Sequence, residues 1–274
     1  MRMKKYLFVA VMAAMVFAVN AKAQLSVGVG YANERVTSKT SYDLGDDVKG
    51  YAWTKSHMQL DGFYVEADYN WEFAKVGPGT FALQPGVRYT LLTSPVSGTK
   101  ANFSTKVDVD AKCKYTEHAR YTNHLLDIPV NVKYSYEFVP GALKAYVFAG
   151  PVFSLGLSAS EISVAKGKSN IDGESDKYYS SEKYNVYTGK YTVKAYNPET
   201  KKYDVETNKD DLYKVYNAFD LKLGLGAGVT LCDKVDVKFG YNIGLLNRSF
   251  VKNHDSEKYS AHSNIMYFGV AYNF

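Results

Sequence analysis

The stretch FYVEADYNWEF, residues 63–73, decides the fold of this chain. Its odd positions are apolar and end on Trp71 and Phe73, whereas its even positions are mostly acidic or polar. Successive side chains of a strand point to opposite faces, so the pattern predicts a strand with one apolar and one polar face. A soluble sandwich also produces such alternation. The clustered aromatic residues at the end of the apolar face favour a membrane-spanning strand, because they are typical of an aromatic girdle.

The same period of two recurs along the chain and predicts eight strands, of which the one at 143–157 is least clear because it is apolar on both parities. The predicted strands cover residues 24–33, 58–73, 80–92, 125–138, 143–157, 219–231, 235–245 and 264–274.

The connections between these strands alternate between short and long. The short ones are residues 74–79, 139–142 and 232–234, and the long ones are residues 34–57, 93–123, 158–218 and 246–263. Short periplasmic turns and long extracellular loops are the pattern of outer-membrane barrels. The fold class expected is all-β, an eight-stranded antiparallel up-and-down transmembrane β-barrel with long extracellular loops. Residues 190–207, which contain an Asn-Pro turn signal, are expected to form a hairpin above the membrane.

The first residues predict export. A basic start is followed by an apolar run over residues 6–19 and by the small-x-small pattern Ala21-Lys22-Ala23. We expect a signal peptide over residues 1–23 and the barrel domain over 24–274, in the bacterial outer membrane; the alternative is a retained anchor. The formal net charge of +5 includes four cations and no acid within residues 1–23, so the remainder carries about +1. This balance gives no reason to expect a nucleic-acid partner.

The last strand carries a predicted insertion signal. Its apolar parity ends on the final residue and comprises Met266, Phe268, Val270, Tyr272 and Phe274. An aromatic residue at the end of the final strand resembles the signal that the barrel-assembly machinery reads. The expected partners are therefore this machinery during insertion and the outer-membrane lipid afterwards.

The polar parities predict a charged barrel interior. Its expected members are Glu66, Asp68, Arg88, Asp127, Lys133, Asp220, Lys222, Asp236 and Lys238. Eight strands leave just enough room for side chains to fill the lumen, and buried charges must pair. The favoured interpretation is a salt-bridged plug; the alternative is a gated pore.

The positions of the five histidines do not predict a catalytic site or a metal site. All five lie in or beside predicted extracellular loops, and a nucleophilic site needs a base within hydrogen-bond reach. His262-Ser263-Asn264 resembles the His-x-Ser-Asn element of a lipid A deacylase, but the intervening residue is missing, so His262 and Ser263 should point to opposite faces. We expect no catalytic residue, no metal site and no cofactor.

The longest predicted loop, residues 158–218, is rich in tyrosine and lysine. The tyrosines proposed to contact a surface ligand or an envelope protein are Tyr178, Tyr179, Tyr184, Tyr187, Tyr191 and Tyr196, and Tyr203 lies in the same loop. Tyrosine provides large contact area at low entropic cost. The alternative is an ordinary polar loop in which the tyrosines support a hairpin.

Four stretches resemble the PorT-like group of outer-membrane β-barrel proteins, which is similar in architecture to the OmpA-type barrel. They are residues 126–134 (LDIPVNVKY), 146–151 (YVFAGP), 219–228 with its alternating glycines, and 270–274 (VAYNF). The resemblance covers the chain after the signal peptide and implies the fold; the namesake's association with protein secretion does not follow from barrel motifs.

Three functions remain open from the sequence. The leading hypothesis is a non-enzymatic barrel that acts in surface interaction or as an envelope-complex scaffold. The second is a narrow channel for small solutes, and the third is a lipid-modifying enzyme.

Overall fold

The computed structural model describes residues 24–43, 51–105, 111–171, 174–209, 214–251 and 257–274. The predicted signal peptide, residues 1–23, lies outside them. Among the described residues, no helix is long and apolar enough to cross a membrane.

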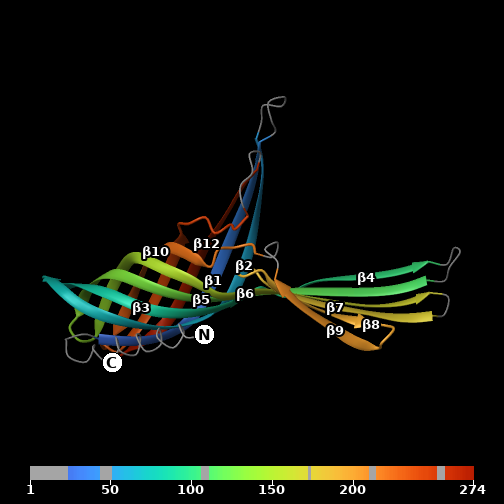
Figure 1. The fold of residues 1–274 in the computed structure, drawn as a ribbon. Helices are drawn as coiled ribbons and strands as arrows, with labels where there is room; N and C mark the ends of the chain where they lie inside the picture. The colour runs from blue at the N-terminus through green and yellow to red at the C-terminus, as the bar shows by residue number, and fades with distance from the viewer. Residues whose placement is uncertain (1–23, 44–50, 106–110, 172–173, 210–213, 252–256) are drawn as a thin grey trace.

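Eight antiparallel strands close into a barrel (Figure 1). They are β1 (Gln24–Asp43), β2 (Tyr51–Val76), β3 (Gly79–Thr93), β5 (Ala111–Val139), β6 (Leu143–Ile171), β10 (Phe219–Leu231), β11 (Val235–Gly244) and β12 (Glu257–Asn273). The ring closes where β1 pairs with β12 and where β5 pairs with β6. The predicted eight-stranded antiparallel barrel is therefore confirmed.

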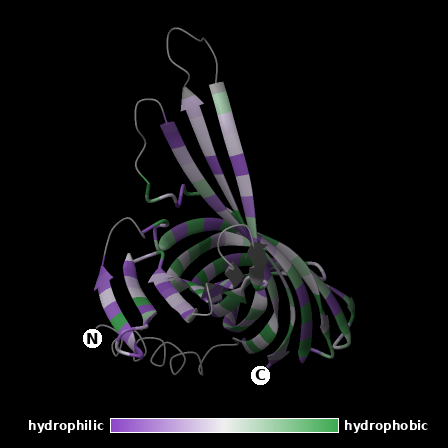
Figure 2. Cartoon of the chain, turned by 90° about the vertical axis from the view of Figure 1, so that its right-hand side faces the viewer, coloured by the Kyte–Doolittle hydropathy of each residue, from purple (hydrophilic) through white to green (hydrophobic). Residues whose placement is uncertain are grey.

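Along each barrel strand, odd- and even-numbered side chains lie on opposite sides of the barrel wall. The outward side chains are apolar and exposed, as in Val65 at 43% and Phe239 at 49%, while the inward ones are buried. In β12 the proposed insertion residues Met266, Phe268, Val270 and Tyr272 lie on the outward face, and Phe274, which directly follows the strand, is also exposed. Figure 2 shows the resulting alternation of hydrophobic and hydrophilic residues along the barrel strands.

Much of what was predicted as long loops is in fact strand. β5 and β6 each have 29 residues and remain paired far beyond the barrel. Four further strands join them: β4 (Ser97–Thr105), β7 (Glu174–Asn185), β8 (Lys190–Asn197) and β9 (Lys202–Lys209). The predicted hairpin is confirmed as β8 and β9. The physical reason for the difference is that several adjacent strands stabilise one another, whereas each stretch alone gives a weak signal.

Two sheets project from the same end of the barrel and diverge from each other (Figure 1). One consists of the outer parts of β1, β2 and β12. The other, here called the outer sheet, has the strand order β4-β5-β6-β7-β8-β9. Tight turns close the opposite end, where Gly77, Gly141 and Asp233 adopt positive φ.

An irregularity on β5 and β6 sets the faces of the outer sheet. The register between the two strands shifts between His124 and Leu125. As a result the inward residues of β6 are even-numbered within the barrel, as in Ser154, and odd-numbered above it, as in Ala159. The even-numbered residues of β6 in the outer sheet therefore continue the outward surface of the barrel.

Candidate functional site

Six of the nine predicted interior charges form ion pairs in the lumen. Arg88 donates two hydrogen bonds to Glu66 Oε2, at 3.0 Å from Nε and 2.8 Å from Nη2. Lys238 binds Glu66 and also Asp68, the latter at 2.8 Å. The pair Lys133–Asp236 follows at 3.6 Å, and all six side chains are at most 7% exposed.

Aromatic rings fill the space around these ion pairs. The guanidinium of Arg88 lies 3.7 Å from the ring centroid of Tyr267 and 4.9 Å from that of Tyr64. The ammonium of Lys133 lies 3.8 Å from the ring centroid of Tyr146. The attraction between a cation and the face of an aromatic ring is stronger away from water, so the rings partly offset the burial of the charges and also occupy the lumen.

The remaining three predicted charges are also buried, but none of them forms an ion pair with a described residue. Lys222 donates to Ser154 Oγ at 3.1 Å, and Asp220 lies on the same face of β10. Asp127 pairs in register with Arg88 across β3 and β5 and is 1% exposed. The structure therefore places all nine predicted residues inside the barrel.

A second polar network closes the mouth below the projecting sheets. Arg248 lies 3.6 Å from the carboxylate of Glu34 and donates to the hydroxyl of Tyr187 at 2.8 Å. Tyr187 in turn donates to Asn123 Oδ1 at 2.9 Å, and Asn123 Nδ2 donates to Glu34 Oε2 at 2.9 Å. The four side chains form a ring of contacts, which is also joined by Ser263 through Glu34.

This network corrects one prediction. Tyr187, proposed as a surface-binding residue, is 6% exposed, and burial raises the pKa of its hydroxyl to about 12. Its segment is tied to the barrel by Val186, which donates to the carbonyl of Ala159 and accepts from Val215. Tyr187 is buried because the chain after β7 folds inward over the mouth.

Of this network only Tyr187 was among the predicted site residues, whereas Glu34, Asn123, Arg248 and Ser263 were not. Glu34 continues the inward parity of β1, so a longer first strand in the prediction would have included it. Arg248 lies outside the named strands, and no pattern marks it.

One face of the outer sheet is basic. Antiparallel partners share a face, so the registers assign one set of residues to the face that continues the outward surface of the barrel. Its charged members, here called the basic face, are Lys114, Arg120, Lys166, Lys168, Lys177, Lys183, Lys190, Lys194 and Lys209. Among the described side chains of β5 to β9, no acidic residue shares this face.

The acidic residues lie on the opposite face of the same sheet. They are Glu117, Glu161, Glu182, Asp204 and Glu206. Three of them already accept hydrogen bonds from side chains: Glu117 from Tyr115 and Ser163, Glu161 from Tyr184, and Asp204 from Asn197. The outer sheet thus separates its charges by face.

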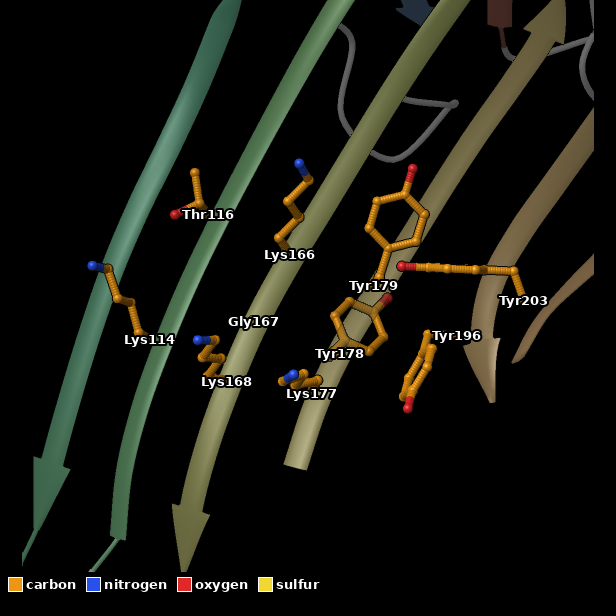
Figure 3. A pocket seen from close by; sticks show the side chains of 10 residues that line it. All are labelled: Lys114, Thr116, Lys166, Gly167, Lys168, Lys177, Tyr178, Tyr179, Tyr196 and Tyr203. Carbon is orange, nitrogen blue, oxygen red and sulfur yellow. The ribbon is translucent and has the colours of Figure 1, made fainter. Parts of the chain in front are cut away.

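A groove of about 580 Å³ lies on the outer sheet (Figure 3). It is lined by Lys114, Thr116, Lys166, Gly167, Lys168, Lys177, Tyr178, Tyr179, Tyr196 and Tyr203. The rings of Tyr179 and Tyr203 meet edge to face at 5.2 Å, and those of Tyr196 and Tyr203 do so at 5.6 Å. The groove therefore combines four lysines with a cluster of tyrosines.

Apart from the buried Tyr187, the proposed tyrosines divide into two groups. Tyr179 and Tyr196 line the groove together with Tyr203, and Tyr178 borders it from the other parity of β7. Tyr184 and Tyr191 pair with each other on the acidic face. The lysines of the groove were not among the predicted site residues.

The described histidines show no catalytic arrangement. Ser263 is fully buried and bonds to Glu34, while its neighbour His262 belongs to the other parity of β12. Within the described part of the chain, no group of three His, Cys, Asp or Glu side chains could hold a metal ion.

Residues 21–249 match the family described as Outer membrane protein beta-barrel domain. Among solved structures, the chain is similar to Ail, the attachment invasion locus protein of Yersinia pestis, at 14% identity, with 93% of this chain and 100% of that chain covered and a TM-score of 0.30. It is also similar to Neisserial surface protein A, at 13% identity, 90% and 97% coverage and a TM-score of 0.30. The outer membrane protease OmpT from Escherichia coli is similar at 10% identity, with 94% of this chain and 100% of that chain covered and a TM-score of 0.31. No curated protein matches the sequence.

Proposed function

The chain belongs to the outer membrane protein beta-barrel domain family, and on this premise we propose that it is a closed, non-enzymatic barrel that holds a binding sheet outside the cell. Family membership places it in the bacterial outer membrane, where short turns face the periplasm and long connections face outward. One observation carries the proposal: the chain fills its lumen with paired charges while extending two barrel strands far beyond the membrane.

Closure of the barrel is supported at two levels. The ion pairs around Glu66 and Lys238 occupy the lumen, and the network around Arg248 and Tyr187 lies at the mouth. The cavity beside the mouth network measures only about 10 Å³, and the polar cavity at the short-turn end measures about 90 Å³. A cavity of the smaller size holds about one water molecule. These features favour a scaffold over a channel.

The length of the outer strands supports display of a binding surface. A tilted strand spans the hydrocarbon core with ~9–11 residues, whereas β5 has 29. Lys114 precedes the lipid-facing residue Ile128 on this strand by a stretch of roughly 45 Å, at ~3.3 Å per residue. A sheet that only connected barrel strands would not require its basic and acidic residues to lie on opposite faces, so this separation supports a binding role.

The proposal also includes three more specific roles. A role as scaffold in an envelope complex, membership of the PorT-like group and contact with the barrel-assembly machinery through the last strand are compatible with the barrel. The outward row of Met266, Phe268, Val270 and Tyr272 on β12 supports the last of these.

Planar-bilayer conductance tests the closed barrel against the channel. Purified, heat-modifiable protein should give no single-channel steps, while a porin in the same bilayer should give them. Reproducible steps from this protein would contradict the proposal. Mass spectra of lipid A from cells with and without the protein should be identical, and a consistent difference would instead support a lipid-modifying enzyme.

A further inference from the structure

We infer that the groove of the outer sheet binds an acidic polysaccharide outside the cell. This inference rests on the proposed function, because it names the ligand of the surface that the barrel displays. It is carried by the charge of the groove, by its tyrosines and by its distance from the membrane.

The lysines of the groove lie beside one another without acidic neighbours. Lys114 pairs in register with Lys168, and Lys168 pairs with Lys177, so three like charges face the same side of adjacent strands. Like charges directly opposite each other destabilise a sheet. No described residue forms an ion pair with any of the three, and all three are exposed. A negatively charged ligand would relieve this repulsion.

The tyrosines give the groove a fixed apolar wall. Tyr203 contacts Tyr179 and Tyr196 edge to face, so each ring is held by its neighbours. Lys166 lies 5.9 Å from the ring centroid of Tyr179, and Lys194 lies 4.7 Å from that of Tyr203. Tyrosine combines a large apolar ring with a hydroxyl group and loses little entropy on binding. This combination suits sugar rings, whose faces carry C–H groups and whose edges carry hydroxyls.

The position of the groove favours a polymer over a lipid headgroup. At roughly 45 Å along β5 from the lipid-facing Ile128, Lys114 lies beyond the headgroup layer, which adds only ~5–8 Å to each side of the hydrocarbon core. The charges are also all lysines, which act as point charges, whereas bidentate recognition of a phosphate favours arginine. The groove therefore recognises the density of negative charge along a chain of sugars.

Binding of defined polymers to the full-length protein in nanodiscs tests this inference. The probes are polygalacturonic acid and dextran sulfate, with neutral dextran, oligothymidylate and polyglutamate as comparisons. The test variant is K166A/K168A/K177A. The matched control is K39A/K55A/K258A, which removes the same charge from the outward face of the β1–β2–β12 sheet. Heat-modifiable mobility of each variant shows that the barrel is folded.

We expect the acidic polysaccharides to bind and neutral dextran not to bind. Affinity should fall about tenfold or more in K166A/K168A/K177A, a loss equivalent to ~1.4 kcal/mol, and should change little in the control. Tyr203→Ala should weaken polysaccharide binding as well, which a purely electrostatic contact would not show. Equal losses in both triple variants, or equally tight binding of oligothymidylate or polyglutamate, would overturn the inference.

Failure of the inference and failure of the proposed function are separable. If no acidic polysaccharide binds while the bilayer shows no conductance, the ligand class is wrong and the closed barrel stands. If conductance steps appear, the proposed function fails whatever the groove binds.

Discussion

Lysines have opposite environments in the barrel and on the outer sheet. Lys238 in the lumen is 6% exposed and contacts two carboxylates, and Lys133 is paired with Asp236. Lys168 on the sheet is exposed and has two further lysines as its neighbours across the strands. Inside the barrel a charge is removed from water, and six of the nine buried charges are stabilised in ion pairs, whereas on the sheet water solvates the lysines. The interior lysines hold the structure together, and the sheet lysines remain available to a ligand.

The largest expected effect is in the lumen. Glu66→Gln removes a charge that both Arg88 and Lys238 need, so the free energy of unfolding should fall by about 3–5 kcal/mol. Urea unfolding in lipid vesicles, followed by the heat-modifiable gel shift, measures the loss. Glu72→Gln is the control, because Glu72 and Lys75 form an exposed pair at 4.0 Å, worth about 0–1 kcal/mol. Equal losses would contradict the distinction between buried and exposed charges.

Two glycines, one in the barrel and one on the outer sheet, allow the packing of the two regions to be compared. A Cβ on Gly150, within the barrel, would lie 2.1 Å from the carbonyl oxygen of Val130, so Gly150→Ala should cost about 2–3 kcal/mol of unfolding free energy. On the outer sheet, the nearest atom to a Cβ on Gly167 is the carbonyl oxygen of Lys114, at 3.3 Å. Gly167→Ala should therefore change the same quantity by less than about 1 kcal/mol. A larger loss from Gly167→Ala than from Gly150→Ala would show that the sheet is the more tightly packed region.

The mouth network should show an intermediate effect. Tyr187→Phe leaves Asn123 without its donor and Arg248 without one acceptor, so it should cost about 1–2 kcal/mol. Because burial raises the pKa of Tyr187 above the ordinary value of 10.0 to about 12, the folded state favours the protonated hydroxyl. Its contribution is complete below pH 10 and is lost as the pH rises towards 12. Unfolding measured from pH 9 to 12 should lose this step in Tyr187→Phe, and an unchanged profile would contradict the role.

The smallest effect is expected on the basic face. Lys168→Ala should change the unfolding free energy by no more than about 0.5 kcal/mol, with a slight gain because two like-charged neighbours lose a source of repulsion. The control is Lys202→Ala, which alters an exposed lysine on the acidic face of the same sheet. A loss above about 1 kcal/mol from Lys168→Ala would show that the lysine serves stability.

The regular alternation of apolar and polar residues predicted the barrel. Side chains of a strand alternate between two faces, and the face in contact with lipid must be apolar. The same alternation assigns residues such as Glu66 and Lys238 to the interior, because they lie on the polar parity of their strands. Arg248 could not be placed in this way, because it reaches the mouth of the barrel from a segment outside the named strands.

The basic face was hidden for two physical reasons. The chain after residue 23 has a net charge of about +1, and this sum conceals the separation because Lys168 and Glu161 lie on opposite faces of one strand. The parity of β6 also changes near the register shift between His124 and Leu125. Extending the barrel pattern upward along β6 would have put the lysines on the wrong side.

The central claim is that lysines are buried inside the barrel but exposed on the outer sheet. Lysine labelling on intact cells tests it most directly, because the reagent distinguishes accessible from buried lysines. Cells that carry the protein are treated with a membrane-impermeant amine-acylating reagent, and labelled peptides are quantified by mass spectrometry. The account predicts rapid labelling of Lys166, Lys168 and Lys177 and protection of Lys133 and Lys238 until the barrel is unfolded. Labelling of Lys238 as fast as Lys168, or no labelling of the sheet lysines on intact cells, would contradict a closed barrel with an external sheet.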